Sequence, residues 1–126
     1  MVVSMATNCE IKNVSESNET KEIGRAKLEI VNVSGNKVAR FVLKKGWKWS
    51  TDIKPVVKTE WCEAPHFQYQ ISGVVHGKLK DGTEFEIKPG DVSSIPAGHD
   101  MWVVGDEPAV GIEFTASNIG RELSKR

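Results

Sequence analysis

The amino-acid sequence predicts an all-β protein built as one domain, a small barrel or sandwich. Short runs rich in β-branched and aromatic residues follow one another from about residue 22, and clusters of Gly, Pro, Asn and Asp separate them. Before residue 117 no stretch shows the apolar period of an amphipathic helix. The 126 residues are enough for a single core, and frequent short strands favour a barrel or sandwich over a layered α/β fold.

The elements are predicted in order along the chain. Residues 1–20 are mostly polar, so we expect an N-terminal arm there that is either loose or a first edge strand. The barrel is predicted over residues 21–117, and residues 118–126 are expected to form a tail or a short helix capped by Ser117 or Asn118. The strands are predicted over residues 26–33, 37–47, 55–61, 67–79, 84–90, 92–98, 101–105 and 109–116.

Turn residues indicate how these strands are joined. Asp81-Gly82 is typical of a two-residue hairpin turn, and residues 34–36, Ser-Gly-Asn, predict another tight turn. Residues 89–91, Pro-Gly-Asp, and residues 105–108, Gly-Asp-Glu-Pro, mark further reversals. We therefore expect mostly antiparallel neighbours.

Charge and composition exclude several classes of function. The chain has 17 basic and 17 acidic residues and a formal net charge of +0, so no general field attracts it to nucleic acid or to an anionic membrane. It has no apolar run of about 18 residues and no typical export leader, and we expect a cytoplasmic protein. In a reducing compartment Cys9 and Cys62 are expected to remain thiols rather than form a disulfide.

Residues 60–73, with the sequence EWCEAPHFQYQISG, carry the candidate site. If they form one strand, successive side chains point to opposite faces. The apolar face then carries Trp61, Phe67, Tyr69 and Ile71, and the polar face carries Glu60, Cys62, His66, Gln68 and Gln70. Burying a carboxylate, a thiol and an imidazole unpaired is costly, and one metal ion would satisfy all three. A bulge at Pro65 would break this alternation.

The same region resembles the cupin family, which has two characteristic motifs. The second motif, G-x5-P-x-G-x2-H-x3-N, is similar to GDVSSIPAGHDMWVVG, where Gly90, Pro96 and Gly98 stand in register. The C-terminal part of the first motif, G-x5-H-x-H-x3/4-E-x6-G, also matches. His66 stands seven residues before Gly73, in the position of the family glutamate. The resemblance covers roughly residues 38–116 and implies a double-stranded β-helix, or jelly-roll, barrel.

The chain departs from the cupin pattern at the positions of the metal ligands. Glu60 and Cys62 stand where the first motif has its two histidines. Met101 and Gly105 stand at the histidine and asparagine positions of the second motif, and Lys54 at the position of the first glycine.

A histidine near Met101, in the segment that resembles the second motif, can replace the missing histidine ligand. His99 lies two residues before Met101, so both side chains point to the same face of a strand. The candidate metal ligands are therefore His66, Cys62, Glu60 and His99. A thiolate in this set favours zinc first, with iron, nickel and copper as alternatives. Each residue also has a plainer interpretation. His66 would be a hydrogen-bonded barrel histidine and Cys62 a small buried thiol, while Glu60 would be a solvated carboxylate and His99 a turn histidine.

A pocket for a small molecule is predicted beside this site. Trp47 and Trp49 share a face and would form an aromatic rim, although core packing is the plainer role for a tryptophan. Asp100 would orient the ring of His99 if the turn brings the two together. The candidate ligand-binding residues are Gln68, Gln70, Trp47, Trp49, Met101 and Asp100.

The sequence thus predicts a metal-binding, cupin-like protein that holds a small molecule in the barrel lumen. The resemblance implies substrates such as small carboxylates, sugars or thiols. One alternative is a metal-dependent dioxygenase, isomerase or decarboxylase, with Glu60 or Asp100 as acid or base. The other is a metal-free sensor or structural barrel. We expect a homodimer, since barrels of this family commonly pair through sheet edges.

Overall fold

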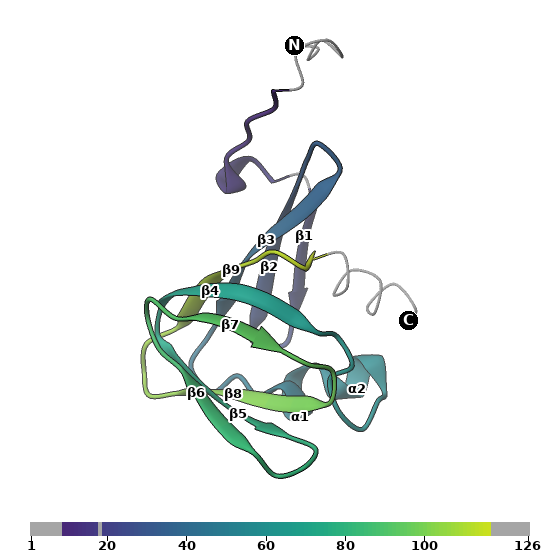
Figure 1. Ribbon diagram of the computed structural model, residues 1–126, viewed down its shortest axis with the longest axis vertical. Helices are drawn as coiled ribbons and strands as arrows, with labels where there is room; N and C mark the ends of the chain where they lie inside the picture. Colours follow the sequence, from purple (N-terminus) through teal and green to yellow (C-terminus); the bar gives the residue numbers. More distant parts are fainter. Residues whose placement is uncertain (1–8, 18, 117–126) are drawn as a thin grey trace.

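The computed structural model describes residues 9–17 and 19–116, which form two antiparallel sheets (Figure 1). The six-stranded sheet has the order β1-β2-β3-β9-β4-β7, and the three-stranded sheet has the order β6-β5-β8. The elements are η1 (Val14–Glu16), β1 (Glu19–Ile23), β2 (Ala26–Val33), β3 (Asn36–Leu43), α1 (Trp49–Asp52), α2 (Lys54–Val57), β4 (His66–Ser72), β5 (Val74–Leu79), β6 (Glu84–Ile87), β7 (Val92–Ile95), β8 (His99–Val104) and β9 (Ala109–Glu113).

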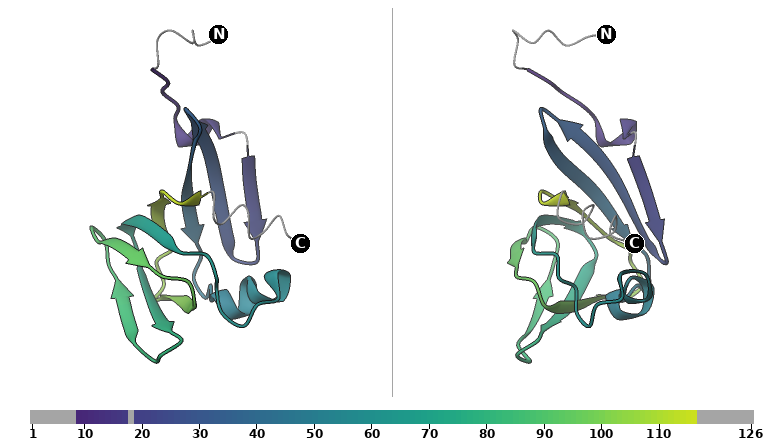
Figure 2. Two further views of the ribbon diagram at one scale, coloured as in Figure 1. Left: turned by 45° about the vertical axis from the view of Figure 1, so that its right-hand side comes forward. Right: turned by 90° about the vertical axis from the view of Figure 1, so that its right-hand side faces the viewer.

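The two sheets form a jelly-roll-like barrel, and this confirms the predicted all-β class. Strands that are distant in the sequence pair within each sheet, as β3 does with β9 and β5 with β8. Figure 2 shows β1, β2 and β3 extending away from the part of the barrel that holds β5, β6 and β8. The short helices α1 and α2 lie near the opposite end of the molecule from the β2–β3 turn (Figures 1 and 2).

Two of the predicted hairpins are present as expected. Ser34 and Gly35, both with positive φ, join β2 to β3. Asp81-Gly82 joins β5 to β6, and the amide of Gly82 donates to the carbonyl of Leu79 at 3.0 Å. These turns fix the register of both hairpins, because a short loop leaves the strands few ways to pair.

The predicted strand over residues 55–61 is wrong. Helix α2 occupies Lys54–Val57, with Pro55 in its first turn, where a missing amide hydrogen costs nothing. The left-handed residue Lys58 (φ 60) ends the helix. Both helices are four residues long, too short to show an apolar period in the sequence.

The predicted strand over residues 67–79 is two strands in different sheets. β4 belongs to the six-stranded sheet and β5 to the three-stranded sheet. The chain changes sheet at Gly73, which has φ +75. A Cβ atom at this position would lie 2.3 Å from the carbonyl oxygen of Pro108, so both the backbone angle and the available space require glycine.

The structure describes part of the predicted N-terminal arm and none of the predicted C-terminal tail. Within the predicted arm, Asn13 and Glu16 form a capping box around η1, and β1 begins at Glu19 as an edge strand paired only with β2 in its sheet. The predicted tail over residues 118–126 lies outside the described residues. Among the residues that the structure describes, no helix has the length and apolar character needed to cross a membrane.

The core lies between the inner faces of the two sheets. β4 buries every second residue from His66 to Gln70, and β9 buries Ala109, Gly111 and Glu113 in the same alternating way. Most of the core is aliphatic or aromatic, but the buried polar residues are concentrated in the strands that carry the candidate site. They are His66, Gln68, Gln70, His99 and Glu113.

Replacement of Gly73 tests the importance of the point where the chain changes sheet. We expect Gly73→Ala to lower the free energy of unfolding by about 3 kcal/mol or more, because it adds a steric clash with backbone to the cost of a left-handed alanine. Gly82→Ala is the matched control. Gly82 has φ +92, and no atom lies within 4 Å of the position that an added methyl group would take, so it should lose only about 1 kcal/mol. Equal losses for both variants in urea denaturation would contradict this account.

Candidate metal centre and lumen

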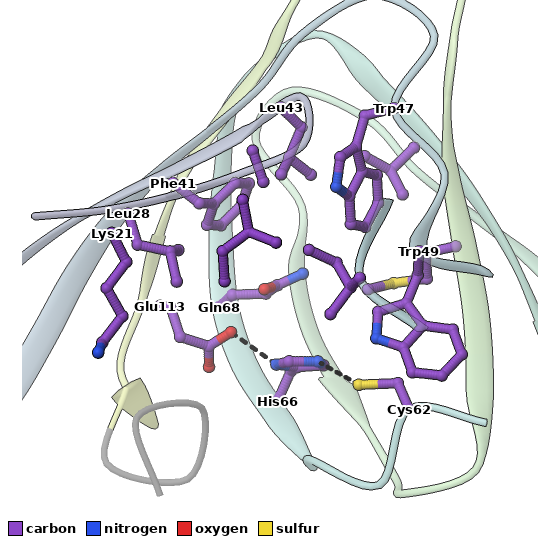
Figure 3. A pocket seen from close by; sticks show the side chains of 15 residues that line it. Lys21, Leu28, Phe41, Leu43, Trp47, Trp49, Cys62, His66, Gln68 and Glu113 are labelled. Atoms are coloured by element: carbon purple, nitrogen blue, oxygen red, sulfur yellow. Dashed lines mark hydrogen bonds and ion pairs between the residues drawn. The ribbon is translucent and has the colours of Figure 1, made fainter. Parts of the chain in front are cut away.

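Cys62, His66 and His99 form a buried cluster inside the barrel. One potential ligand atom from each residue lies within 4.8 Å of those of the other two. The Sγ atom of Cys62 is 3.8 Å from Nε2 of His66, as the dashed line in Figure 3 shows. The two imidazole rings are 4.9 Å apart between centroids. The cluster therefore presents a soft sulfur and two ring nitrogens to a common region.

Three different segments bring these side chains together. His66 begins β4 and His99 begins β8, so the two imidazoles come from opposite sheets. Cys62 lies in the loop before β4 and pairs with His99 as an isolated antiparallel bridge. Its amide donates to the carbonyl of His99 at 2.9 Å, and the amide of Gly98 donates to the carbonyl of Cys62 at 2.7 Å. Backbone pairing thus places the thiol beside the ring of His99.

His99 is held as a neutral imidazole with one ring nitrogen unused by the described residues. Its Nδ1–H donates to the carbonyl oxygen of Pro96 at 2.7 Å. Its Nε2 is buried and has no hydrogen-bond partner in the part of the chain that the structure describes. Burial, and secondarily the neighbouring His66, lowers the pKa of His99 from 6.5 to about 4. A neutral imidazole with an unused nitrogen is the form that binds metal ions.

His66 is oriented by a carboxylate that comes from the neighbouring strand. Nδ1 of His66 donates to Oε1 of Glu113 at 2.8 Å (Figure 3), and Glu113 is only 1% exposed. The other oxygen, Oε2, accepts from the amides of Phe67 and Thr115 at 3.1 and 3.2 Å and from the hydroxyl of Thr115. Because the proton lies on Nδ1, the lone pair of Nε2 faces Cys62. Histidine ligands of metal ions are commonly oriented in this way.

The donor set fits a divalent metal ion. In a tetrahedral site with bonds of about 2.0–2.3 Å, the ligand atoms lie about 3.3–3.7 Å apart. The 3.8 Å between Cys62 and His66 is close to this range, and the limit of 4.8 Å for all three atoms requires only small side-chain movements. The unused Nε2 of His99 adds an independent reason, since a buried acceptor without a partner is unfavourable.

Glu60 does not belong to the cluster, and its predicted placement is wrong. Its side chain is 78% exposed and forms an ion pair with Lys54 at 2.8 Å, and the hydrogen bond from Lys54 lowers the pKa of Glu60. The prediction assumed one strand over residues 60–73, but β4 begins at His66. Alternation of faces therefore does not apply to the irregular segment before it, which contains Pro65.

Asp100 also differs from its predicted role. Its Oδ1 accepts from the amides of Ser50 and Met101, at 3.1 and 2.9 Å, and so attaches α1 to β8. The carbonyl of Pro96, rather than Asp100, fixes the ring of His99.

A cavity of about 90 Å³ lies beside the cluster. Of the residues predicted to bind a ligand, Trp47, Trp49, Gln68 and Met101 line it. Gln70 is fully buried but does not line the cavity, and its amide nitrogen donates to the carbonyls of Ser72 and Gly73. The complete lining is Lys21, Ile23, Ala26, Leu28, Phe41, Leu43, Trp47, Trp49, Ile53, Cys62, His66, Gln68, Val75, Met101 and Glu113 (Figure 3).

Glu113 is the site residue that the sequence reasoning missed. One signal was available: in the run AVGIEFTA, an acidic residue occupies the inward parity of an otherwise apolar strand. Its partner His66 is 47 residues away in the sequence, and only the pairing of β4 with β9 brings them together.

Comparison with solved structures supports the fold. No family model and no curated protein matches the sequence. A protein of unknown function from Rhizobium leguminosarum bv. viciae 3841 is 13% identical, with a TM-score of 0.58 over 82% of this chain and 91% of that one. A DUF1255 protein of unknown function from Acinetobacter sp. ADP1 is 15% identical, with a TM-score of 0.52 over 75% and 90%.

An enzyme of the cupin superfamily is also similar in structure. Bacillus subtilis oxalate decarboxylase, described with Mn(II) centres, is 27% identical to this chain, with a TM-score of 0.56. The match covers 78% of this chain and only 28% of the enzyme. A cupin-like fold is therefore supported, and the altered ligand motif stays a prediction.

Glu113→Gln tests the hydrogen-bond arrangement behind His66. The variant replaces one carboxylate oxygen with an amide NH2 group, which would face the N–H and O–H donors that the carboxylate accepts from. We therefore expect the free energy of unfolding to fall by about 2–4 kcal/mol. We also expect ¹⁵N NMR of His66 to show a mixture of tautomers in place of Nδ1–H alone. Glu60→Gln, an exposed control, should change neither the urea midpoint nor the tautomer. A Glu113→Gln protein as stable as wild type, with His66 unchanged, would contradict the arrangement.

Proposed function

We propose that this protein binds one divalent metal ion through Cys62, His66 and His99 and holds a small molecule beside the ion in the lumen. The observation that supports this proposal most strongly is the convergence of Sγ and two imidazole nitrogens in a buried space. Two of these groups are already prepared for coordination. His66 has its proton fixed on Nδ1 by Glu113, and Nε2 of His99 has no partner among the described residues.

Zinc is the ion that this donor set suits first. A thiolate with two imidazoles is softer than the oxygen-rich sets that magnesium, calcium and manganese prefer. Manganese is named for the similar oxalate decarboxylase, but the thiol of Cys62 argues against carrying that ion over to this chain. Iron, nickel and copper are the alternatives.

Three protein ligands leave one position of a tetrahedral ion for a small molecule. A bound ion would act there as a Lewis acid or as an anchor for the ligand. The carboxylate of Glu113 would orient the ring of His66, and the backbone carbonyl of Pro96 would orient the ring of His99. The mostly apolar lining would exclude water from the lumen.

The structure favours a binding role over the enzymatic alternative. A dioxygenase, isomerase or decarboxylase needs an acid or base near the open position. The two groups predicted for this task, Glu60 and Asp100, do not line the cavity. Glu113 does line it, but both of its oxygens accept hydrogen bonds from neighbouring protein groups.

Elemental analysis tests the metal site directly. We expect untagged protein, loaded with zinc and desalted, to retain about one ion per chain, and Cys62→Ser, His66→Gln and His99→Gln each to weaken zinc affinity by at least about 100-fold, because each removes one of three ligands. His76→Gln is the matched control, since His76 lies on the surface beside Glu84. Circular dichroism would establish that each variant is folded.

Two results would contradict the proposal. One is wild-type protein that retains no zinc, iron, nickel or copper after loading. The other is a loss of metal in His76→Gln that equals the loss in His99→Gln.

A further inference from the structure

Two tryptophans enter the lumen from the segment between β3 and α1. Trp47 and Trp49 are 4% and 3% exposed, and both line the cavity. Lys48, which lies between them, pairs as an isolated bridge with Trp102 of β8, and its Nζ lies 5.1 Å from the centre of that ring. Because side chains alternate along extended backbone, the two neighbours of Lys48 point the other way, into the barrel.

The backbone holds this segment firmly in place. The amide of Val103 donates to the carbonyl of Trp47 at 2.9 Å, and the amide of Trp47 donates to the carbonyl of Lys44 at 2.9 Å. The amide of Ser50 donates to Asp100 at 3.1 Å. The two indoles are therefore fixed to β8 on both sides of the bridge, and they are positioned before any ligand arrives.

Both indole N–H groups are buried and lack an acceptor within residues 9–17 and 19–116. Neither Nε1 of Trp47 nor Nε1 of Trp49 has a hydrogen-bond partner in the described segments. Figure 3 shows both nitrogens on the side of the ring that faces other lining residues. A buried N–H group normally has a partner, and an indole nitrogen can only donate. The lumen therefore offers two unsatisfied donors to a molecule inside it.

The rest of the lining shows what kind of molecule would satisfy these donors. Two donors suit an acceptor with two oxygens, and a carboxylate accepts hydrogen bonds more strongly than a neutral oxygen. Lys21 also lines the cavity, but its ammonium group pairs with Glu19 at 3.6 Å. The oxygens of Glu113 accept from protein groups and so do not serve the indoles. Most of the remaining surface is apolar, with Leu28, Phe41 and Leu43 as examples.

We propose that the lumen selects a small monocarboxylate with an apolar body, whose carboxylate accepts hydrogen bonds from the indole N–H groups of Trp47 and Trp49. This inference rests on the proposed function of the lumen as a ligand site and adds the class of ligand and the residues that select it. The cavity of about 90 Å³ limits the ligand to a short or branched chain. In protein without the metal ion, a second carboxylate on the ligand would lie against apolar side chains, which is unfavourable.

The NMR signals of the indole groups provide a direct test. The protein has four tryptophans, so ¹⁵N-labelled protein should give four indole N–H signals, which Trp→Phe variants assign. Isobutyrate and butyrate are the probes, and isobutyramide, isobutanol and the dicarboxylate oxalate are the comparison compounds. Each titration is run on zinc-loaded protein and on chelator-treated protein.

We expect isobutyrate or butyrate to move the Trp47 and Trp49 signals downfield in a saturable way and to leave those of Trp61 and Trp102 in place. Isobutyramide and isobutanol should bind more weakly in both samples, and oxalate should bind more weakly in the chelator-treated protein, where no zinc can hold its second carboxylate. Trp47→Phe and Trp49→Phe keep an aromatic ring but lose the donor, so each should weaken isobutyrate binding about tenfold or more. Trp102→Phe, the matched control, should bind like wild type.

Comparison of the zinc-loaded with the chelator-treated protein distinguishes failure of the ligand inference from failure of the metal site. Downfield shifts in chelator-treated protein, combined with no metal retention, would overturn the metal site and leave the indole donors standing. Zinc-binding protein whose Trp47 and Trp49 signals do not respond to either monocarboxylate at millimolar concentration would overturn the inference. That result would leave water as the partner of the two donors. Equal responses to isobutyrate and isobutanol would also overturn it.

Discussion

Burial of two imidazoles and a thiol at one place in the lumen is the constraint on which the rest of the site depends. Polar groups removed from water need partners, and the surrounding chain supplies them from several elements. Glu113 of β9 binds the ring of His66, the carbonyl of Pro96 binds the ring of His99, and backbone pairing fixes Cys62 beside it. With these partners in place, one potential ligand atom from each of the three residues lies close to those of the other two.

Much of the fold could be predicted because its signals are local. Alternating strands, hairpin turns and the Pro96–Gly98 framework depend on residues that are near in sequence. Other features were missed for physical reasons that the structure makes clear. Helices α1 and α2 are shorter than the window in which a helical period appears, and the change of sheet at Gly73 depends on a close approach to Pro108.

The site was predicted in part, and one correct result came from incorrect reasoning. Cys62 and His66 do lie together, but not because they share a face of one strand. β4 begins only at His66, and Cys62 arrives through its bridge to His99. The same assumption placed Glu60 in the lumen, where the structure does not put it. Glu113 could not be assigned to His66 from the sequence, because pairing between distant strands decides which inward residues meet.

The candidate metal centre and the cavity beside it differ in chemical character. The centre offers sulfur and nitrogen to an ion, and the cavity is mostly apolar with two indole donors. Such a combination suits recognition of a small molecule that has one polar group and an apolar body.

A crystal structure of the zinc-loaded protein, with diffraction data recorded on both sides of the zinc absorption edge, tests the central claim most directly. The account predicts one anomalous peak in the lumen, bounded by Sγ of Cys62, Nε2 of His66 and Nε2 of His99. A peak only at the surface, for example at His76 with Glu84 and Glu86, or a lumen without an ion in crystals of protein that retains zinc, would contradict it.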